Sequence, residues 1–241
     1  MWRSNALADG AWLLAPGRVA YGPAYRAMHD LANRRADGEI PDTLILLEHP
    51  PVFTAGKRWE PGHLLFDEPS LARMGAELHY VDRGGSVTFH GPGQLVGYPI
   101  VHLGPEPDVI AYLRKVEEVI MRACADLGVA AGRSEGFTGV WAGERKVCAI
   151  GVRVQRDVTL HGFALNCATD VAWFGAIVPC GIADRGVTTL TELTGREITV
   201  GEALPVVAHR FEDVFGSKLR PAPDELVSAF ASNTVVAPAN G

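Results

Sequence analysis

The sequence predicts an α+β fold with a single domain, in which helices flank a mixed and mainly antiparallel β-sheet. Segments of helical and of strand periodicity follow one another without the regular βαβ alternation of a doubly wound parallel sheet. Turn signals typical of neighbouring antiparallel strands occur at Gly84-Gly85 and Arg156-Asp157. No repeat or Ser/Pro-rich linker divides the chain. We therefore expect one domain over residues 1–230 and a flexible tail of small and polar residues over 231–241.

Three helices are predicted from apolar periodicity and end signals. They cover residues 23–36, 108–128 and 199–216. Asp108 is the expected N-cap of the second helix, in which apolar residues recur every three or four positions. Thr199 and Glu202 have capping-box spacing in the third. Pro205 lies inside that helix and implies a kink or a later start, because proline cannot donate a backbone hydrogen bond.

Strands are predicted where short apolar or alternating runs are bounded by turn residues. They cover residues 43–49, 77–82, 86–90, 94–102, 146–155 and 158–166. Pro50-Pro51 stops the first strand. The second and third are expected to form a hairpin around Gly84-Gly85, and the last two a pair around Arg156-Asp157.

Composition and charge exclude several functional classes. The chain has 47% hydrophobic and 21% charged residues, which is typical of a globular protein and excludes a mainly disordered one. With 22 Lys and Arg against 28 Asp and Glu, the net charge of −6 argues against nonspecific nucleic-acid binding. No signal peptide is recognised, and no apolar run approaches the roughly 20 residues that span a bilayer. We therefore expect a soluble, cytoplasmic protein that binds neither nucleic acid nor membrane.

A glycine-rich segment covers residues 83–99 and reads RGGSVTFHGPGQLVGYP. Such a density of glycine in a strand-forming run indicates a backbone that turns tightly or approaches a ligand closely. Alternation places Ser86, Thr88 and His90 on one face, which could be the polar face of a site. A hairpin with generous turns explains the glycines equally well. The spacing matches neither a Walker loop nor a dinucleotide fingerprint.

Lys146 lies at the start of a predicted strand with an otherwise apolar face. The residues that share this face with it are Cys148, Ile150, Val152 and Val154. An ammonium among apolar side chains either reaches solvent from the end of the strand or is desolvated, with a lowered pKa. The residues alone leave both alternatives open.

Of the four cysteines, Cys180 has the least obvious structural role. It lies in Val-Pro-Cys-Gly, where proline and glycine predict a tight turn and an accessible thiol. Cys124 and Cys148 lie on apolar faces, and Cys167 lies at a strand end, so all three are explained as small buried residues. Without a CxxC pair, the four indicate reduced thiols and no disulfide framework.

The eight histidines show no metal-binding spacing, because neither HxxxH nor HExxH occurs. We therefore expect no metal site. His90 and His161 are candidates for polar residues of a site, and a buried, hydrogen-bonded role explains each of them at least as well.

Five segments in order resemble the lipoyl(octanoyl) transferase family of lipoate biosynthesis. They are LILLEHPPVFTAGKR at 44–58, DRGGSVTFHGPGQLVGYPI at 82–100, GVWAGERKVCAIGVRV at 139–154, TLHGFALNCATD at 159–170 and IVPCGI at 177–182. The resemblance covers residues 44–194 and implies the α+β fold of biotin and lipoate protein ligases. It identifies residues 1–230 as an octanoyltransferase catalytic domain.

The resemblance implies that Cys180 is the nucleophile that forms an acyl thioester and that Lys146 is its partner. It also implies a substrate site lined by Arg83, Gly84, Gly85, Ser86, Val87, Thr88, Phe89, His90, Ala149, Ile150, Gly151, Gly162, Phe163 and Ala164. A free thiol has a pKa of about 8.5, which a nearby ammonium lowers. A lysine in apolar surroundings can in turn deprotonate an incoming amine.

The implied reaction transfers an octanoyl group from acyl carrier protein to a specific lysine of a lipoyl domain. The implied acceptors are the lipoyl domains of 2-oxoacid dehydrogenase complexes and the glycine cleavage H protein. The resemblance implies neither ATP nor a metal nor another cofactor, because the thioester already carries the activation. Since both protein partners are expected to be acidic, we predict a basic patch at the site mouth, drawn from Arg83, Arg145, Arg153 or Arg156.

Three alternatives remain open. An ATP-dependent lipoate or biotin ligase on the same fold would make an acyl-adenylate and would need no nucleophilic cysteine. A noncatalytic module that binds acyl carrier protein would bind equally well without Cys180. A cysteine hydrolase would pass the same acyl group to water.

Overall fold

A computed structural model describes residues 10–178 and 186–231 and contains one eight-stranded sheet in the order β11-β1-β2-β6-β10-β9-β8-β7. Its strands are β1 (Ala11–Arg18), β2 (Thr43–Glu48), β6 (Gln94–Ile100), β7 (Gly132–Ser134), β8 (Phe137–Ala142), β9 (Arg145–Gln155), β10 (Val158–Asn166) and β11 (Leu219–Pro221). β1 runs parallel to β2 and β11, and the other neighbours are antiparallel. The predicted single-domain α+β class with a mixed, mainly antiparallel sheet is confirmed.

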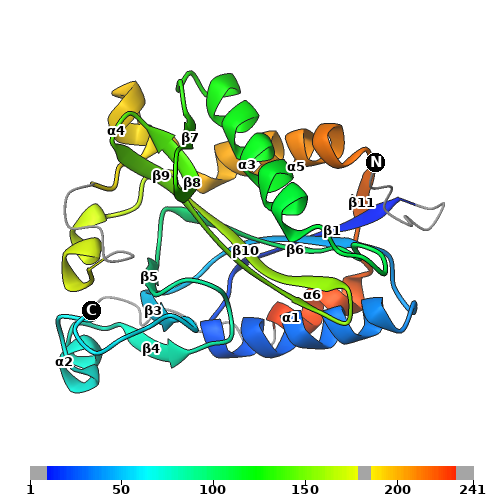
Figure 1. Cartoon of the computed structure of the whole chain (residues 1–241), viewed down its shortest axis with the longest axis horizontal. Helices are drawn as coiled ribbons and strands as arrows, with labels where there is room; N and C mark the ends of the chain where they lie inside the picture. The colour runs from blue at the N-terminus through cyan, green and yellow to red at the C-terminus, as the bar shows by residue number, and fades with distance from the viewer. Residues whose placement is uncertain (1–9, 179–185, 232–241) are drawn as a thin grey trace.

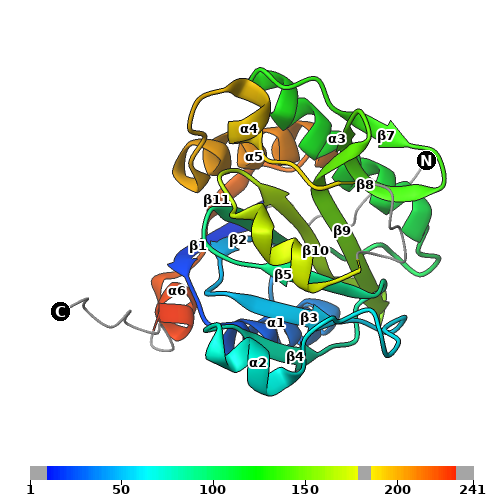
Figure 2. The same ribbon diagram turned by 90° about the vertical axis from the view of Figure 1, so that its left-hand side faces the viewer.

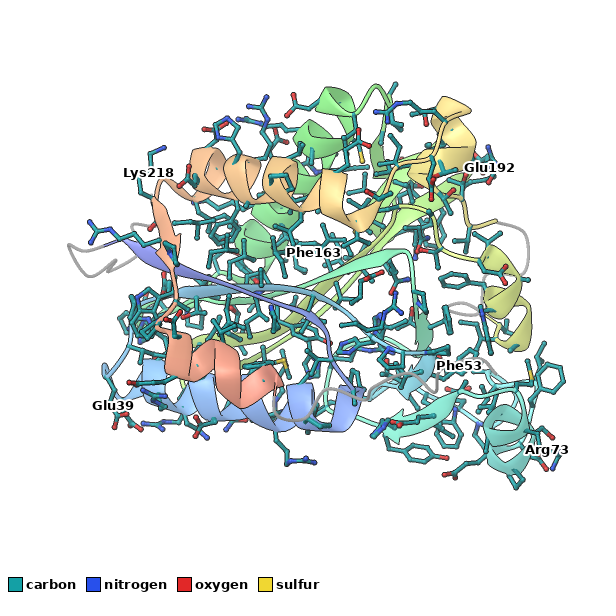
Figure 3. The ribbon with its side chains drawn as sticks, turned by 180° about the vertical axis from the view of Figure 1, so that it is seen from behind. Glu39, Phe53, Arg73, Phe163, Glu192 and Lys218 are labelled. Carbon is teal, nitrogen blue, oxygen red and sulfur yellow. The ribbon has the colours of Figure 1, made fainter. Side chains whose placement is uncertain are left out.

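Helices cover both faces of the large sheet (Figure 1). On one side lie α1 (Tyr21–Ala36) and α6 (Asp224–Ala231), and on the other α3 (Val109–Asp126) and α5 (Val200–Phe215). Each face has its own core, and Phe163 of β10 belongs to the core under α3 and α5 (Figure 3). The short helix α4 (Leu190–Thr194) precedes α5.

A second, three-stranded sheet has the order β4-β3-β5, with β3 (Val52–Ala55) between β4 (Glu77–Tyr80) and β5 (Val87–His90). This corrects the predicted hairpin, because β4 and β5 each pair with β3 and not with each other. The two prolines before β3 concealed a strand that follows them directly. The small sheet packs with α2 (Glu68–Arg73) and the 3-10 helix η1 (Val171–Ala176), and Figure 2 shows it on the same side of the large sheet as α1.

The helix ends follow the predicted caps. Asp108 accepts a hydrogen bond from the backbone N–H of Ala111 at 2.8 Å, and Thr199 accepts one from Glu202 at 3.2 Å. The expected later start of the last predicted helix is wrong, since α5 is helical from Val200 with Pro205 inside it. The N-cap and the burial of the apolar face stabilise the helix by more than the loss of one backbone hydrogen bond at Pro205 destabilises it.

Residues 156 and 157 have positive φ angles of 51° and 61°, as expected of a tight turn between β9 and β10. Of the predicted tail, only Ala231 is among the described residues. No helix within the described part of the chain is both long and apolar enough to cross a membrane.

Candidate functional site

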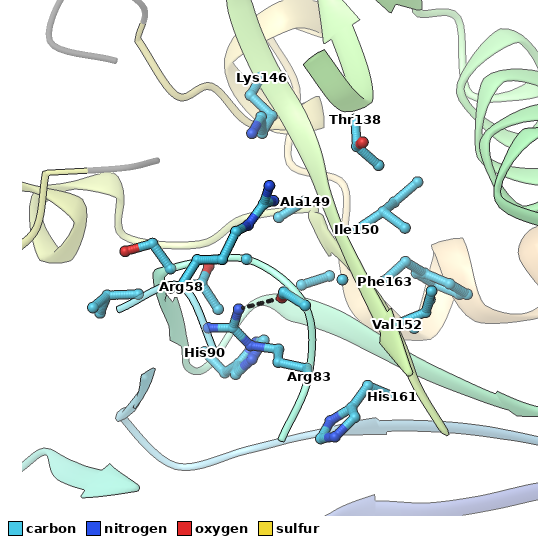
Figure 4. Close-up of a pocket in the computed structure, with 18 of the residues that line it drawn as sticks. Arg58, Arg83, His90, Thr138, Lys146, Ala149, Ile150, Val152, His161 and Phe163 are labelled. Atoms are coloured by element: carbon cyan, nitrogen blue, oxygen red, sulfur yellow. Dashed lines mark hydrogen bonds between the residues drawn. The ribbon is translucent and has the colours of Figure 1, made fainter. Parts of the chain in front are cut away.

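A cavity of about 630 Å³ lies where β9 and β10 approach the loop that joins β4 to β5 (Figure 4). The implied site residues that line it are Arg83, Gly84, Gly85, Ser86, Val87, Thr88, His90, Lys146, Ala149, Ile150, Gly151, Gly162, Phe163 and Ala164. Phe89 does not line it and packs instead against Phe53 of β3 and Trp173 of η1. Cys180 lies outside the described residues. The structure thus brings three separate sequence segments, around residues 83–90, 146–151 and 162–164, to one cavity.

The glycine-rich loop is held by the segment that follows β3. Backbone N–H groups of residues 56, 57 and 58 donate to the carbonyls of Ser86, Arg83 and Gly85, at 2.9, 3.0 and 3.0 Å. A Cβ at Gly56 would lie 2.6 Å from the Gly85 carbonyl oxygen, so only glycine fits there. On its other side, the Gly84 N–H donates to the Val152 carbonyl of β9 at 3.1 Å. The glycines therefore permit close backbone contacts on both sides of the loop.

Arg83 is 7% exposed, and its guanidinium donates hydrogen bonds to other groups of the protein. It donates to the Thr54 carbonyl at 2.5 Å, to the Thr54 hydroxyl at 3.0 and 3.2 Å and to the Gly84 carbonyl at 3.0 Å. These bonds tie the cavity loop to β3. Arg83 therefore acts mainly as an anchor of the cavity wall.

Small residues of two neighbouring strands form one side of the cavity. Ala149 pairs with Ala164, and Gly151 pairs with Gly162, across the β9–β10 ladder. A Cβ at Gly162 would lie 2.2 Å from the Gly97 carbonyl oxygen. The small side chains leave room for a ligand beside the sheet, and Gly162 also permits the close approach of β6.

An apolar wall lies on the α3 side of the cavity. It consists of Val109 and Leu113 from α3, Phe137 from β8 and Ile150 and Val152 from β9. The pairing of β9 with β8 extends from Arg145 to Cys148, so the later part of β9 is not paired with β8. The cavity therefore combines a polar loop with apolar surface, which suits a ligand having an aliphatic chain.

Lys146 lies at the end of the cavity where β9 begins. Its ammonium nitrogen is 4.7 Å from the centroid of the Trp141 ring, close enough for a cation–π interaction. Gly139 of β8 lies beside its aliphatic stem, and a Cβ at Gly139 would lie 2.7 Å from the Cys148 carbonyl oxygen, so glycine permits the close approach of β8 to β9 here. The side chain is half-buried and lines the cavity, so the ammonium is neither fully solvated nor enclosed in the core.

The backbone of Lys146 pairs with the segment that follows residue 185. Its N–H donates to the Gly186 carbonyl at 2.9 Å, and its carbonyl accepts from the Thr188 N–H at 3.0 Å. Val187 and Ile177 both line the cavity. Described residues on both sides of the stretch containing Cys180 therefore line the same cavity as Lys146.

The other three cysteines are buried, as predicted. Burial raises the pKa of the Cys124 and Cys167 thiols to about 12 and that of Cys148 well above its usual range. None of the three lines the cavity. At neutral pH they are protonated and unreactive, which agrees with their interpretation as packing residues.

At the other end of the cavity, the Asp82 carboxylate lies next to the side chains of His161, Arg153 and His29. It accepts a hydrogen bond from His161 Nε2 at 2.7 Å and pairs with the guanidinium of Arg153, while His29 Nε2 lies 3.6 Å away. His161 is 2% exposed and has a φ of 60°, which is unusual for a residue with a side chain. Burial and the charges of Arg83 and its other basic neighbours lower the pKa of His161 to about 3. The imidazole is therefore neutral and donates its Nε2–H to the carboxylate.

His29, Asp82 and His161 are also the described residues whose arrangement could hold a metal ion, since their ligand atoms all lie within 4.8 Å of one another. Sequence motifs missed this group because its members come from α1, the loop after β4 and β10. Asp82 already pairs with Arg153. A divalent ion would have to share the carboxylate with this guanidinium, whose charge opposes it.

A chain of buried hydrogen bonds connects His90 to the segment beside Lys146. His90 Nδ1 lies 2.8 Å from Gln94 Oε1, Gln94 Nε2 donates to Asn166 Oδ1 at 2.9 Å, and Asn166 Nδ2 donates to the Thr188 carbonyl at 3.1 Å. Burial lowers the pKa of His90 to about 3, aided by nearby His49. His90 is thus a neutral group of the cavity wall, held by side chains from β6 and β10.

The four arginines predicted to form a basic patch do not form one. Arg145, Arg153 and Arg156 pair with Glu192, Asp82 and Asp37, and Arg83 is buried. These carboxylates come from distant parts of the sequence, so their pairing left no local signal. Arg58, the last residue of the resembling segment at 44–58, lines the cavity instead.

Other cavity residues were also missed by the sequence analysis. They are Tyr21, His63, Tyr98, Val109, Leu113, Gly136, Phe137, Thr138, Val152, Asn166, Phe174, Ile177 and Val187. Asn166 lies within one of the five resembling segments, and Val109 and Leu113 lie on a predicted helix. Only their arrangement in space shows that they share the cavity. His161, by contrast, was predicted as a candidate polar residue of a site, and it lines the cavity.

Comparisons with known proteins agree on one family. The family model described as lipoyl protein ligase A/B catalytic domain matches residues 21–212. An octanoyltransferase of Nocardia farcinica is 50% identical over 198 residues, covering 80% of this chain and 76% of the relative. An octanoyltransferase of Koribacter versatilis is 44% identical over 225 residues, covering 87% and 90%.

Solved structures show the same fold at lower identity. A putative lipoate protein ligase of T. acidophilum with bound lipoic acid superposes with a TM-score of 0.73 at 18% identity, covering 93% of both chains. A lipoate-protein ligase A bound with ATP has a TM-score of 0.72 at 17% identity, covering 94% of this chain and 93% of that one. At these identities the likeness extends to the fold alone.

Proposed function

As a member of the octanoyltransferase family, within the lipoyl protein ligase A/B catalytic domain family, this chain is an acyltransferase of lipoate biosynthesis, and we propose that it works through an octanoyl thioester on Cys180. Acyl carrier protein donates the octanoyl group. The acceptor is a lysine of a lipoyl domain, in a 2-oxoacid dehydrogenase complex or the glycine cleavage H protein. We place this reaction in the cytoplasm.

The observation that carries the proposal is the position of Lys146. Its ammonium lies in a cavity with an apolar wall, and its backbone pairs with Gly186 and Thr188. Ile177 and Val187, which precede and follow the stretch containing Cys180, line the same cavity. A nearby ammonium favours the thiolate form of a cysteine, which is the nucleophilic form.

The first half-reaction transfers the acyl group to the enzyme. The Cys180 thiolate attacks the thioester carbonyl carbon, a C–S bond forms, and the carbonyl π electrons move to the oxygen. When this oxyanion collapses, the bond to the carrier sulfur breaks. The Lys146 ammonium protonates the departing thiolate and is left as a neutral amine.

The second half-reaction forms the amide. The amine of the target lysine attacks the acyl-Cys180 carbonyl, and neutral Lys146 accepts the proton that this amine must lose. The bond to Cys180 then breaks, releasing the amide and restoring both the thiolate and the Lys146 ammonium. The cycle uses no ATP, metal or other cofactor, because the thioester already carries the activation.

Intact-mass measurement tests the proposal. Incubation with octanoyl-acyl carrier protein without ATP should add one octanoyl group, which hydroxylamine removes. Cys180→Ser should abolish this labile adduct, whereas Cys124→Ala, at a buried thiol outside the cavity, should retain it. An adduct that survives Cys180→Ser would contradict the covalent mechanism. Formation of product only with free octanoate and ATP would identify a ligase instead.

A further inference from the structure

A bulge in the β8–β9 ladder determines which residue lies opposite Lys146. Val140 of β8 pairs with Cys148 of β9. Regular antiparallel pairing would then place Trp141 opposite Val147, but the register shifts here and Trp141 pairs with Lys146. Bulges change the direction of a side chain and are frequent beside active sites. This bulge aligns an aromatic residue with the lysine of the cavity.

The Trp141 indole is a fixed surface against which the Lys146 ammonium lies. Trp141 is 4% exposed, and its ring centroid lies 6.0 Å from that of Phe137, which lines the cavity. The ammonium nitrogen of Lys146 lies 4.7 Å from the centroid of the Trp141 ring, within the range of a cation–π interaction. Because a free lysine side chain samples many rotamers, this contact restricts where the ammonium lies in the cavity.

The contact with Trp141 stabilises a charge that has no ionic partner among the described residues. Within residues 10–178 and 186–231, no carboxylate pairs with the Lys146 ammonium, and none of the residues that line the cavity is acidic. Lys115 also lies near an aromatic ring, that of Phe215 at 5.3 Å, but outside the cavity. An indole attracts a cation more strongly than a phenyl ring does. The shorter contact with the more strongly attracting ring therefore belongs to the lysine of the cavity.

We propose that Trp141 is a positioning residue for acyl transfer, whose indole face holds the Lys146 side chain at its end of the cavity as an ammonium. This inference rests on the proposed function. The ring attracts the ammonium and not the neutral amine, so it favours the charged form that stabilises a thiolate. For the same reason it favours proton transfer from the target amine to Lys146. Trp141 does not line the cavity, so it acts through Lys146 and not on the substrate.

Nuclear magnetic resonance of lysine-labelled protein tests the contact without a substrate. The chain has four lysines, Lys57, Lys115, Lys146 and Lys218, and Lys146→Arg assigns the Cε–Hε signal of Lys146. The ring current of Trp141 should move this signal upfield in the wild type and not in Trp141→Leu. Trp141→Leu should also lower the pH of half-protonation at Lys146 by about one unit, which corresponds to the loss of a partly desolvated cation–π contact. The other three lysines should titrate as in the wild type.

Fluorinated tryptophan separates the effect on charge from the effect on packing. Each fluorine withdraws electron density from the indole face and changes its size little. Mono-, di- and trifluorotryptophan inserted at Trp141 should therefore lower the pH of half-protonation at Lys146 stepwise. The same residues inserted at Trp12, which packs against the core on the other face of the large sheet, are the matched control and should leave it unchanged. An unchanged titration in Trp141→Leu, or equal effects of fluorination at the two positions, would overturn the proposal.

Single-turnover acylation of Cys180 connects the contact to catalysis. In Trp141→Leu, the pH above which the acylation rate falls should decrease by about one unit, as in the lysine titration. The donor concentration for half-maximal rate should stay near the wild-type value. A shifted lysine titration with an unchanged acylation profile would show that Trp141 has no part in the reaction. Failure of the wild type to form an adduct on Cys180 would instead refute the proposed function.

Discussion

The two ends of the cavity differ in how their polar groups are satisfied. At one end, Asp82 joins His161, Arg153 and His29 in a largely buried group in which the acid has cationic and hydrogen-bonding partners. At the other end, Lys146 and Arg58 line the cavity, and none of the lining residues within 10–178 and 186–231 is acidic. His161 of β10 pairs with Val152 of β9. From Val152 back to Lys146, β9 extends by about 20 Å at the usual rise of a strand, so the two ends of the cavity are well separated. The first end can serve as a structural anchor, and the second retains charge for a substrate.

Substitution of Lys146 tests this difference with the largest expected effect. Lys146→Met should lower the octanoyl-transfer rate by about 10²- to 10⁴-fold, the usual contribution of acid–base catalysis, with little loss of stability. Lys115→Met is the matched control, because the Lys115 ammonium lies 5.3 Å from the Phe215 ring and outside the cavity. Amide product is measured by mass spectrometry. A near-wild-type rate for Lys146→Met would remove this residue from the mechanism.

The pH dependence of stability tests the buried end. Burial and nearby cations lower the pKa of His161 to about 3, while an unfolded histidine titrates near about 6.5. As the pH falls between these values, the unfolded chain binds a proton that the folded chain does not. His161 should therefore reduce the free energy of unfolding by up to about 1.4 kcal/mol per pH unit.

Urea unfolding from about pH 6 to about pH 4 measures this contribution. His161→Gln should make the dependence less steep by about one proton, and His209→Gln, at an exposed histidine outside this group, is the comparison variant. Equal slopes for His161→Gln and wild type would show that folding does not lower the pKa of His161.

The glycine positions test how tightly the strands beside the cavity pack, with the smallest expected effect. Gly162→Ala should reduce the free energy of unfolding by about 1–3 kcal/mol, because its Cβ would lie 2.2 Å from the Gly97 carbonyl oxygen. Gly132→Ala in β7 is the control, since no atom lies within 4 Å of its new Cβ. Denaturant midpoints compare the two variants. Equal stability would mean that β6 and β10 can separate without cost.

The sequence allowed the helices and the main strands to be predicted because their signals are local. The Asp108 and Thr199 caps act within three residues, and the period of apolar residues identifies the face that each helix buries. The small sheet was predicted incorrectly, because β3 pairs with strands on both sides of it and Pro50-Pro51 concealed its start. Pairing of distant segments has no comparable local signal.

The candidate site was predictable where its residues lie in characteristic motifs. The glycine-rich loop, Lys146, and the paired Ala149–Gly151 and Gly162–Ala164 segments meet at the cavity as the resemblance implied. The prediction of a basic patch was wrong, because Arg145, Arg153 and Arg156 pair with distant acids. A formal charge in a sequence does not show whether that charge is available to a ligand.

The sequence by itself determined the fold class, the helix caps and the residue types that acyl transfer requires, because these depend on periodicity, local hydrogen bonds and functional groups. Only the tertiary structure decided which charges remain for a substrate. Three arginines near the cavity illustrate this. Arg83 donates hydrogen bonds to β3 and Arg153 pairs with Asp82. The Arg58 side chain instead extends toward Lys146 (Figure 4). Long-range packing selects those partners, and electrostatic interactions depend on the resulting distances and burial.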